Sequence, residues 1–159
     1  MASAVVRAAG EGEKRWFLGG GLHTWKVRAT DSDGSLLVFE DELEGGKVTP
    51  LHMHADVDEA IYVLEGEIVL EAHGEPVVVG TGGFAFAPRG VPHAFMVTSD
   101  RARLLAIQTP GSGESFYIQA SETVTDGSTS GPVDFERLGA IAVETGATTI
   151  LGPPPFAMR

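Results

Sequence analysis

The sequence predicts an all-β sandwich or barrel with one short helix near its C-terminus. Three observations support this class. Short apolar or alternating stretches recur at intervals of about ten residues, which is typical of all-β domains. Glycine and proline, 21 and 9 of the 159 residues, punctuate these stretches as turn formers. One late stretch, 135–145, instead places Leu138, Ile141 and Ala142 at helical spacing.

The first expected strands lie before residue 45. Residues 15–18 predict a strand that stops at three glycines, and 22–29 alternate in part, with Trp25 facing inward. An Asp- and Gly-containing turn at 31–34 leads into a third strand over 35–43, with Leu37, Phe39 and Asp41 on one face and Leu36, Val38 and Glu40 on the other. The N-terminal part of the chain therefore predicts three short strands in succession.

The later strands are expected to follow the same pattern of short runs between turns. A hairpin tip at 73–76 and a sharp proline-bounded corner at 88–92 separate several of them. For the late helix, Asp134 is placed to cap the start and Gly146 to end it. The remaining expected strands are residues 60–64, 67–72, 77–79, 84–86, 93–97, 101–108 and 114–119.

The chain divides into one barrel domain with two flanking segments. Residues 1–14 are small and polar and predict a flexible N-terminal arm. The strands define a barrel over residues 15–120. Residues 121–159 are expected to hold a Gly- and Ser-rich connector, the C-terminal helix and a Pro-rich tail. A length of 159 residues suits a single domain with a sizeable core.

Composition excludes several functional classes. The formal net charge of −11 disfavours nucleic acid and anionic membranes as partners. The absence of cysteine excludes disulfides, thiolate metal sites and cysteine nucleophiles. The N-terminal apolar run is too short for a signal peptide, and no run approaches membrane-spanning length. A cytoplasmic protein is therefore the expectation.

The stretch between Gly46 and Gly66 predicts a metal site. Alternate residues of a strand share a face, so His52 and His54 can bind one ion together. Glu59 would point to the opposite face of an unbroken strand, so a shared site needs a bend before it. Asp56 and Asp58, which lie in between, favour such a bend.

His93 is the best candidate for a third imidazole. It opens a strand directly after the proline-bounded corner at 88–92. A single histidine on a strand is more often a packed or surface residue, and we interpret His23 as structural and His73 as a solvated turn residue. For three histidines and one carboxylate in this pattern, a divalent metal site is a much better explanation than separate packed or surface positions.

These residues resemble the cupin signature. Its first motif, Gly, His-x-His, Glu and Gly, is matched by Gly46, His52, His54, Glu59 and Gly66. Its second motif, Gly, Pro, Gly, His and Asn, is matched by Gly82, Pro88, Gly90 and His93, with Val97 in place of the Asn. The chain as a whole resembles the small single-domain bacterial cupins similar to quercetin 2,3-dioxygenase.

The resemblance implies a cupin jelly-roll β-barrel that holds one divalent metal ion on His52, His54, Glu59 and His93. The ion could be Fe, Mn, Ni, Co, Cu or Zn, and the sequence does not choose among them. The resemblance also implies a homodimer. Aromatic residues that could wall a substrate pocket are Trp25, Phe39, Tyr62, Phe84, Phe86 and Phe95, although core packing is the commoner role for any single one.

The expected activity is that of a metal-dependent dioxygenase, as the resemblance implies. Its small-molecule substrate would be a flavonol-like or other enolisable hydroxy-ketone, and Glu59 would be the catalytic base as well as a ligand. Two alternatives remain open. One is an O2-independent cyclase or isomerase that uses the metal as a Lewis acid. The other is a non-catalytic cupin that binds a small molecule.

Overall fold

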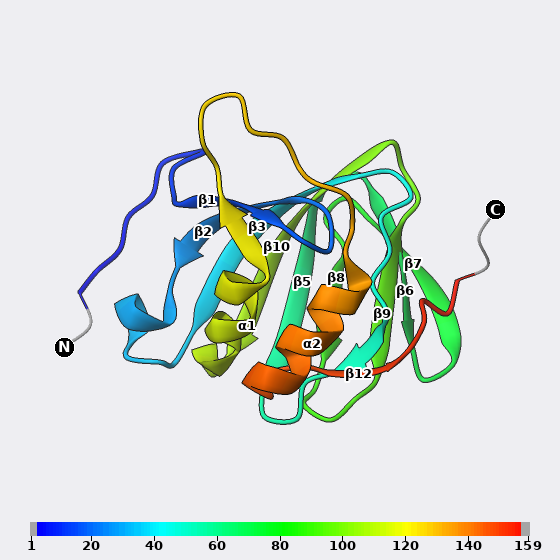
Figure 1. The fold of residues 1–159 in the computed structure, drawn as a ribbon. Coiled ribbons are helices and arrows are strands. Elements are labelled where there is room, and N and C mark those ends of the chain that lie inside the picture. Colours follow the sequence, from blue (N-terminus) through cyan, green and yellow to red (C-terminus); the bar gives the residue numbers. More distant parts are fainter. Residues whose placement is uncertain (1–2, 157–159) are drawn as a thin grey trace.

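Two antiparallel sheets form the fold, as the predicted all-β class requires (Figure 1). The computed structural model describes residues 3–156; residues 1, 2 and 157–159, the ends of the expected arm and tail, lie outside the described residues. The seven-stranded sheet has the order β11 (Ser121–Thr123), β1 (Lys14–Phe17), β2 (Leu22–Val27), β3 (Leu37–Glu44), β10 (Arg101–Thr109), β5 (Asp58–Glu65) and β8 (Phe84–Ala87). The five-stranded sheet has the order β12 (Thr149–Gly152), β4 (Leu51–Met53), β9 (His93–Val97), β6 (Glu67–Ala72) and β7 (Glu75–Gly80).

Side-chain alternation along the central strands builds the interior. In β3, Leu37, Phe39, Asp41 and Leu43 are buried, while the residues between them are more exposed. Strand β10 pairs with both β3 and β5 and alternates in the same way. The two faces predicted over 35–43 are therefore confirmed, and the face with Leu37, Phe39 and Asp41 is the buried one.

The apolar core is divided into two clusters. One gathers around Trp25, Phe39 and Tyr117 and includes the buried residues of both α-helices. The other lies deeper between the sheets, around Ile61, Phe95 and Leu104. Members of both clusters line the same cavity, so the core is split by the space that the functional site occupies.

The helix near the C-terminus is confirmed. Helix α2 spans Phe135–Thr145, the Oδ1 atom of Asp134 accepts a hydrogen bond from the Arg137 amide at 2.9 Å, and Gly146 ends the helix in the left-handed region at φ 65°. The buried face of α2 consists of Leu138, Ile141 and Ala142. No helix within residues 3–156 combines the length and the apolar character needed to cross a membrane.

The strand predicted over 114–119 is wrong. These residues form helix α1 (Glu114–Gln119), which follows two short 3-10 turns in the chain, η1 (Ala29–Ser32) and η2 (Gly111–Gly113). Phe116 and Tyr117 are neighbours in sequence and are both buried, which a half-buried strand does not allow but a helix does. Figure 1 shows α1 and α2 on the same side of the barrel.

Candidate metal centre and its cavity

Four side chains from the two sheets converge on one point. The ligand atoms of His52, His54, Glu59 and His93 all lie within 4.8 Å of one another. His52 on β4 stands directly opposite His93 on β9 in the five-stranded sheet. His54 follows β4, and Glu59 lies on β5 of the other sheet. The expected bend before Glu59 is therefore present, and it carries the chain from one sheet to the other.

Backbone carbonyls orient all three imidazoles. The Nδ1 atoms of His52 and His93 lie 2.8 Å and 2.9 Å from the carbonyl oxygens of Pro50 and Val91, each two residues earlier in the chain. The Nδ1 atom of His54 lies 3.2 Å from the carbonyl oxygen of Ala147. A carbonyl only accepts, so each Nδ1 must carry the proton and donate it. Each Nε2 lone pair is then free to bind a metal, as in the usual second shell of histidine ligands.

The Nε2 atoms meet the carboxylate of Glu59. His93 Nε2 lies 2.9 Å, and His54 Nε2 3.4 Å, from Glu59 Oε2. The buried Nε2 of His54 has no hydrogen-bond partner within residues 3–156. A neutral ring whose proton is on Nδ1 points its Nε2 lone pair at the anionic oxygen of Glu59, and the two repel each other. A cation bound between them would remove this repulsion. The donor set and its orientation therefore fit a divalent ion.

Burial and mutual contacts shift the pKa values of three of the four residues. Burial lowers the pKa of His52 to about 3, with a further contribution from nearby His93, so His52 is neutral at physiological pH. Burial would raise the pKa of Glu59, but its contacts with His54 and His93 outweigh that effect and hold the pKa well below its usual range. Burial also disfavours charge on His93, yet its contact with Glu59 prevails and raises the pKa of His93.

Two residues that the sequence interpretation missed support Glu59. The side-chain amide of Gln108, which is fully buried, donates to Glu59 Oε1 at 3.2 Å and to the Tyr117 hydroxyl at 2.8 Å. Burial raises the pKa of Tyr117 well above its usual value, so the hydroxyl stays neutral. Alternation along 101–108 places Gln108 on the same face as Leu104, and this signal could have identified it. Tyr117 was missed because the strand predicted over 114–119 is wrong.

The comparison with family models decides the classification. Residues 39–108 match the model described as the cupin domain. This stretch contains all four converging ligands. The chain contains a cupin domain. The resemblance read from the two motifs is therefore confirmed.

Among curated proteins, the cupin is similar to quercetin 2,3-dioxygenase of Bacillus subtilis, with 34% identity over 111 residues. The match covers 69% of this chain but only 32% of that enzyme, so the chain spans about a third of its length. An uncharacterized protein of Aquifex aeolicus is 39% identical over 85 residues, which are 54% of this chain and 66% of that protein.

Solved structures show the same fold. A predicted oxalate decarboxylase from Thermotoga maritima aligns with a TM-score of 0.60 and 23% identity, over 67% of this chain and 99% of that one. The structure of KdgF from Halomonas sp. aligns with a TM-score of 0.59 and 18% identity, over 69% of this chain and 94% of that one. At these identities the likeness supports the fold alone.

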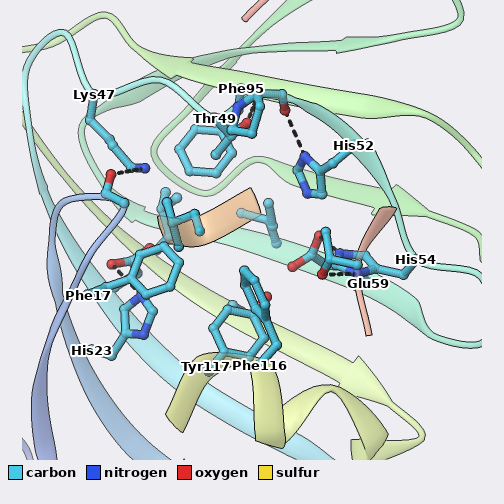
Figure 2. A pocket seen from close by; sticks show the side chains of 18 of the residues that line it. Phe17, His23, Lys47, Thr49, His52, His54, Glu59, Phe95, Phe116 and Tyr117 are labelled. Carbon is cyan, nitrogen blue, oxygen red and sulfur yellow. Dashed lines mark hydrogen bonds and ion pairs between the residues drawn. The ribbon is translucent and has the colours of Figure 1, made fainter. Parts of the chain in front are cut away.

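A cavity of about 90 Å³ opens from the metal centre into the cupin barrel (Figure 2). His52, His54 and Glu59 line one part of it. The walls are largely apolar and come from both core clusters and from helix α2: Phe17, Phe39, Ile61, Phe95, Leu104, Ala106, Phe116, Tyr117, Phe135, Leu138 and Ile150.

The six aromatic residues expected around a substrate divide into three groups. Phe39 and Phe95 line the cavity. Trp25 is buried in the core and packs against Phe39, with ring centroids 5.2 Å apart. Tyr62, Phe84 and Phe86 lie on the outer surface, with exposed fractions of 40%, 60% and 57%.

The expectation that the last three wall the cavity is corrected by strand geometry. Glu59 and Ile61 on β5 face inward, so Tyr62 must face outward. Strand β8 pairs with β5 in register, with Phe84 opposite Tyr62 and Phe86 opposite Ala60, so both phenylalanines share the outer face.

The cavity also contains a polar group of residues away from the metal ligands. His23, which was interpreted as structural, stacks between Phe17 and Phe39 with centroid distances of 4.6 Å. Its Nε2 lies 3.5 Å from Asp41 Oδ1. Burial lowers the pKa of His23 to about 3, raises that of Asp41 to about 7 and lowers that of Lys47 to about 8.

Proposed function

We propose that this cupin is a metal-dependent dioxygenase that acts on an enolisable hydroxy-ketone, flavonol-like or smaller. The observation that carries the proposal is the convergence of three oriented imidazoles and one carboxylate at the edge of an apolar cavity. Similarity to quercetin 2,3-dioxygenase of B. subtilis supports the reaction class. The proposal covers the reaction type and leaves the choice among divalent ions open.

The metal would be held by His52, His54, Glu59 and His93. When bound there, a divalent ion such as Fe, Mn, Co, Ni or Cu would supply Lewis acidity and redox chemistry toward O2, and Zn would supply Lewis acidity alone.

Glu59 is the residue placed to accept the substrate's enol proton. Its Oε2 faces the histidines, while Gln108 holds its Oε1. Its pKa lies well below the usual range, so Glu59 is ionised but is a weak base. A hydroxyl brought to Oε2 would give up its proton to Glu59 only when a bound metal ion lowers the pKa of that hydroxyl. The apolar walls, including Phe39 and Phe95, exclude water and pack against the carbon framework of the substrate.

The size of the cavity limits the substrate. An apolar cavity of about 150 Å³ admits benzene, so the 90 Å³ found here is tight even for one ring and has no room for three. Part of a three-ring flavonol would have to extend outside this space or displace helix α2, whose Phe135 and Leu138 line the cavity. We therefore expect single-ring hydroxy-ketones to bind more readily than flavonols.

A second candidate is an O2-independent cyclase or isomerase. It is favoured by the presence of ionisable groups away from the metal ligands, Asp41 and Lys47, which could move protons without an oxidant. The deciding experiment compares turnover of a single-ring hydroxy-ketone and a flavonol in air and without oxygen, with each of the six metals loaded. Oxygen-dependent product formation is expected. Turnover that is unchanged without oxygen would favour the second candidate, and binding without any turnover would indicate a non-catalytic cupin.

A further inference from the structure

Three ionisable side chains form what we call the inner polar cluster: His23 on β2, Asp41 on β3 and Lys47 in the segment before β4. All three line the cavity that also contains His52 and Glu59 (Figure 2). Apolar side chains such as Phe39, Ile61 and Leu104 line the rest of that cavity. A ligand bound at the metal centre can therefore contact this cluster without leaving the cavity.

The cluster is incompletely satisfied by the protein itself. The Oδ1 atom of Asp41 and the Nδ1 atom of His23 are buried and have no hydrogen-bond partner in the part of the chain that the structure describes. The two residues are 9% and 1% exposed. Buried polar atoms are nearly always paired, and leaving one unpaired is unfavourable, so such atoms suggest a missing partner.

Lys47 can also offer a donor. Its ammonium group donates to the backbone carbonyls of Gly19 and Val48. An ammonium has three N–H donors, so one remains after these two bonds. Tethering the Gly19 loop explains the position of Lys47 but does not explain the unpaired oxygen of Asp41.

We propose that the inner polar cluster binds a hydroxyl group of the substrate, on the side of the molecule away from its enol. The inference rests on the proposed function, because it assumes that the enol end is held at the metal centre. A hydroxyl suits the cluster because it can donate to the Asp41 carboxylate and accept from the Lys47 ammonium at once. The substrate class is thereby narrowed to single-ring hydroxy-ketones that carry a second hydroxyl.

Charge balance favours a neutral group over an ionic one. Asp41 and Lys47 carry opposite charges when ionised, and each favours the charged form of the other against the effect of burial. A substrate carboxylate or amine would add a charge without a counterion in a low-dielectric site, at a large desolvation cost. A hydroxyl leaves the pair balanced and supplies the missing hydrogen bond.

The test uses two hydroxypyranones, allomaltol and kojic acid, which share the chelating hydroxy-ketone and differ by one distal hydroxyl. Calorimetric titration into zinc-loaded protein measures binding without oxygen chemistry. We expect kojic acid to bind about tenfold more tightly, as for a hydrogen bond to a charged group. In a purely apolar site the methyl group of allomaltol would instead be preferred, because burying an unpaired hydroxyl is unfavourable.

Two variants locate the effect. Asp41→Asn should reduce the preference for kojic acid to within about twofold, since it removes the charge-assisted acceptor. Glu42→Gln makes the same change on the exposed face of the same strand and should keep the preference. A crystal of the zinc-loaded wild type with kojic acid should place the distal oxygen within hydrogen-bond distance of Asp41, which tests the proposal even if Asp41→Asn does not fold.

Equal binding of the two compounds, a preference for allomaltol, no binding of either, or an unchanged preference in Asp41→Asn would each overturn the proposal. These outcomes are separate from the fate of the dioxygenase hypothesis. A preference for kojic acid without oxygen-dependent turnover would support hydroxyl binding by the inner polar cluster and would reject the dioxygenase hypothesis. Oxygen-dependent turnover without a preference for kojic acid would support the dioxygenase hypothesis and would reject hydroxyl binding by the cluster.

Discussion

Replacing Gln108 by leucine tests how the protein supports Glu59. The change keeps a similar volume but removes the amide that donates to Glu59 Oε1 at 3.2 Å and to the Tyr117 hydroxyl at 2.8 Å. Two buried oxygens then each lose a hydrogen bond, one of them on an anion. At about 1–3 kcal/mol for each unsatisfied group, we expect the free energy of unfolding to fall by about 2–6 kcal/mol. Loss of a second-shell partner should also weaken metal binding by about 10–100-fold.

The assay for Gln108→Leu combines urea denaturation of the metal-free protein with zinc competition against a chromogenic chelator. Gln119→Leu is the matched control, because Gln119 is exposed at the end of α1 and should leave both quantities nearly unchanged. If Gln108→Leu binds zinc as tightly as the wild type, the claim that Gln108 positions Glu59 is refuted. A loss of stability alone would show only that the amide contributes to packing.

Three further predictions concern the base, the dimer and acid stability. Glu59→Gln should retain the bound metal, as measured by elemental analysis, but should lose turnover. Full activity of this variant would reject the role of Glu59 as the catalytic base. The homodimer implied by the family resemblance should use the exposed aromatic face of the edge strand β8 as its interface. Phe86→Glu should therefore give monomers, as measured by light scattering. The control Val143→Glu, which changes a side chain 86% exposed on α2, should leave the dimer intact. His23 has a pKa of about 3 in the fold and about 6.5 when unfolded, so the stability that it contributes is present above pH 6.5 and is lost as the pH falls toward 3. Between pH 7 and 4.5, the free energy of unfolding of His23→Phe, measured by urea denaturation, should therefore fall by about 2 kcal/mol less than that of the wild type. An equal fall in the two proteins would contradict this.

Much of the metal centre could be predicted because strand alternation is a local property. His52 and His54 share a face whatever the rest of the fold does, and Glu59 can join them only across a bend. The late helix was equally accessible, since Asp134 and Gly146 mark its two ends by their own backbone chemistry.

Other features depend on contacts that are distant in sequence. The six residues of α1 are too few to separate a strand from a helix by periodicity, and burial of both Phe116 and Tyr117 is decided by their tertiary neighbours. The outward position of Phe84 and Phe86 follows from the register of β8 with β5, which the sequence does not state. The inner polar cluster joins three separate segments, and its residue types taken singly predict ordinary surface or core positions.

The metal content of the purified protein tests the central claim most directly. Wild-type protein loaded with a divalent ion and desalted should contain about one ion per chain by elemental analysis, because four buried groups on two sheets are oriented toward a single point. His52→Ala should lose most of this metal, while His73→Ala, at an exposed hairpin turn, should retain it. A wild-type protein that binds no divalent ion, or a His52→Ala variant with unchanged metal content, would contradict the account.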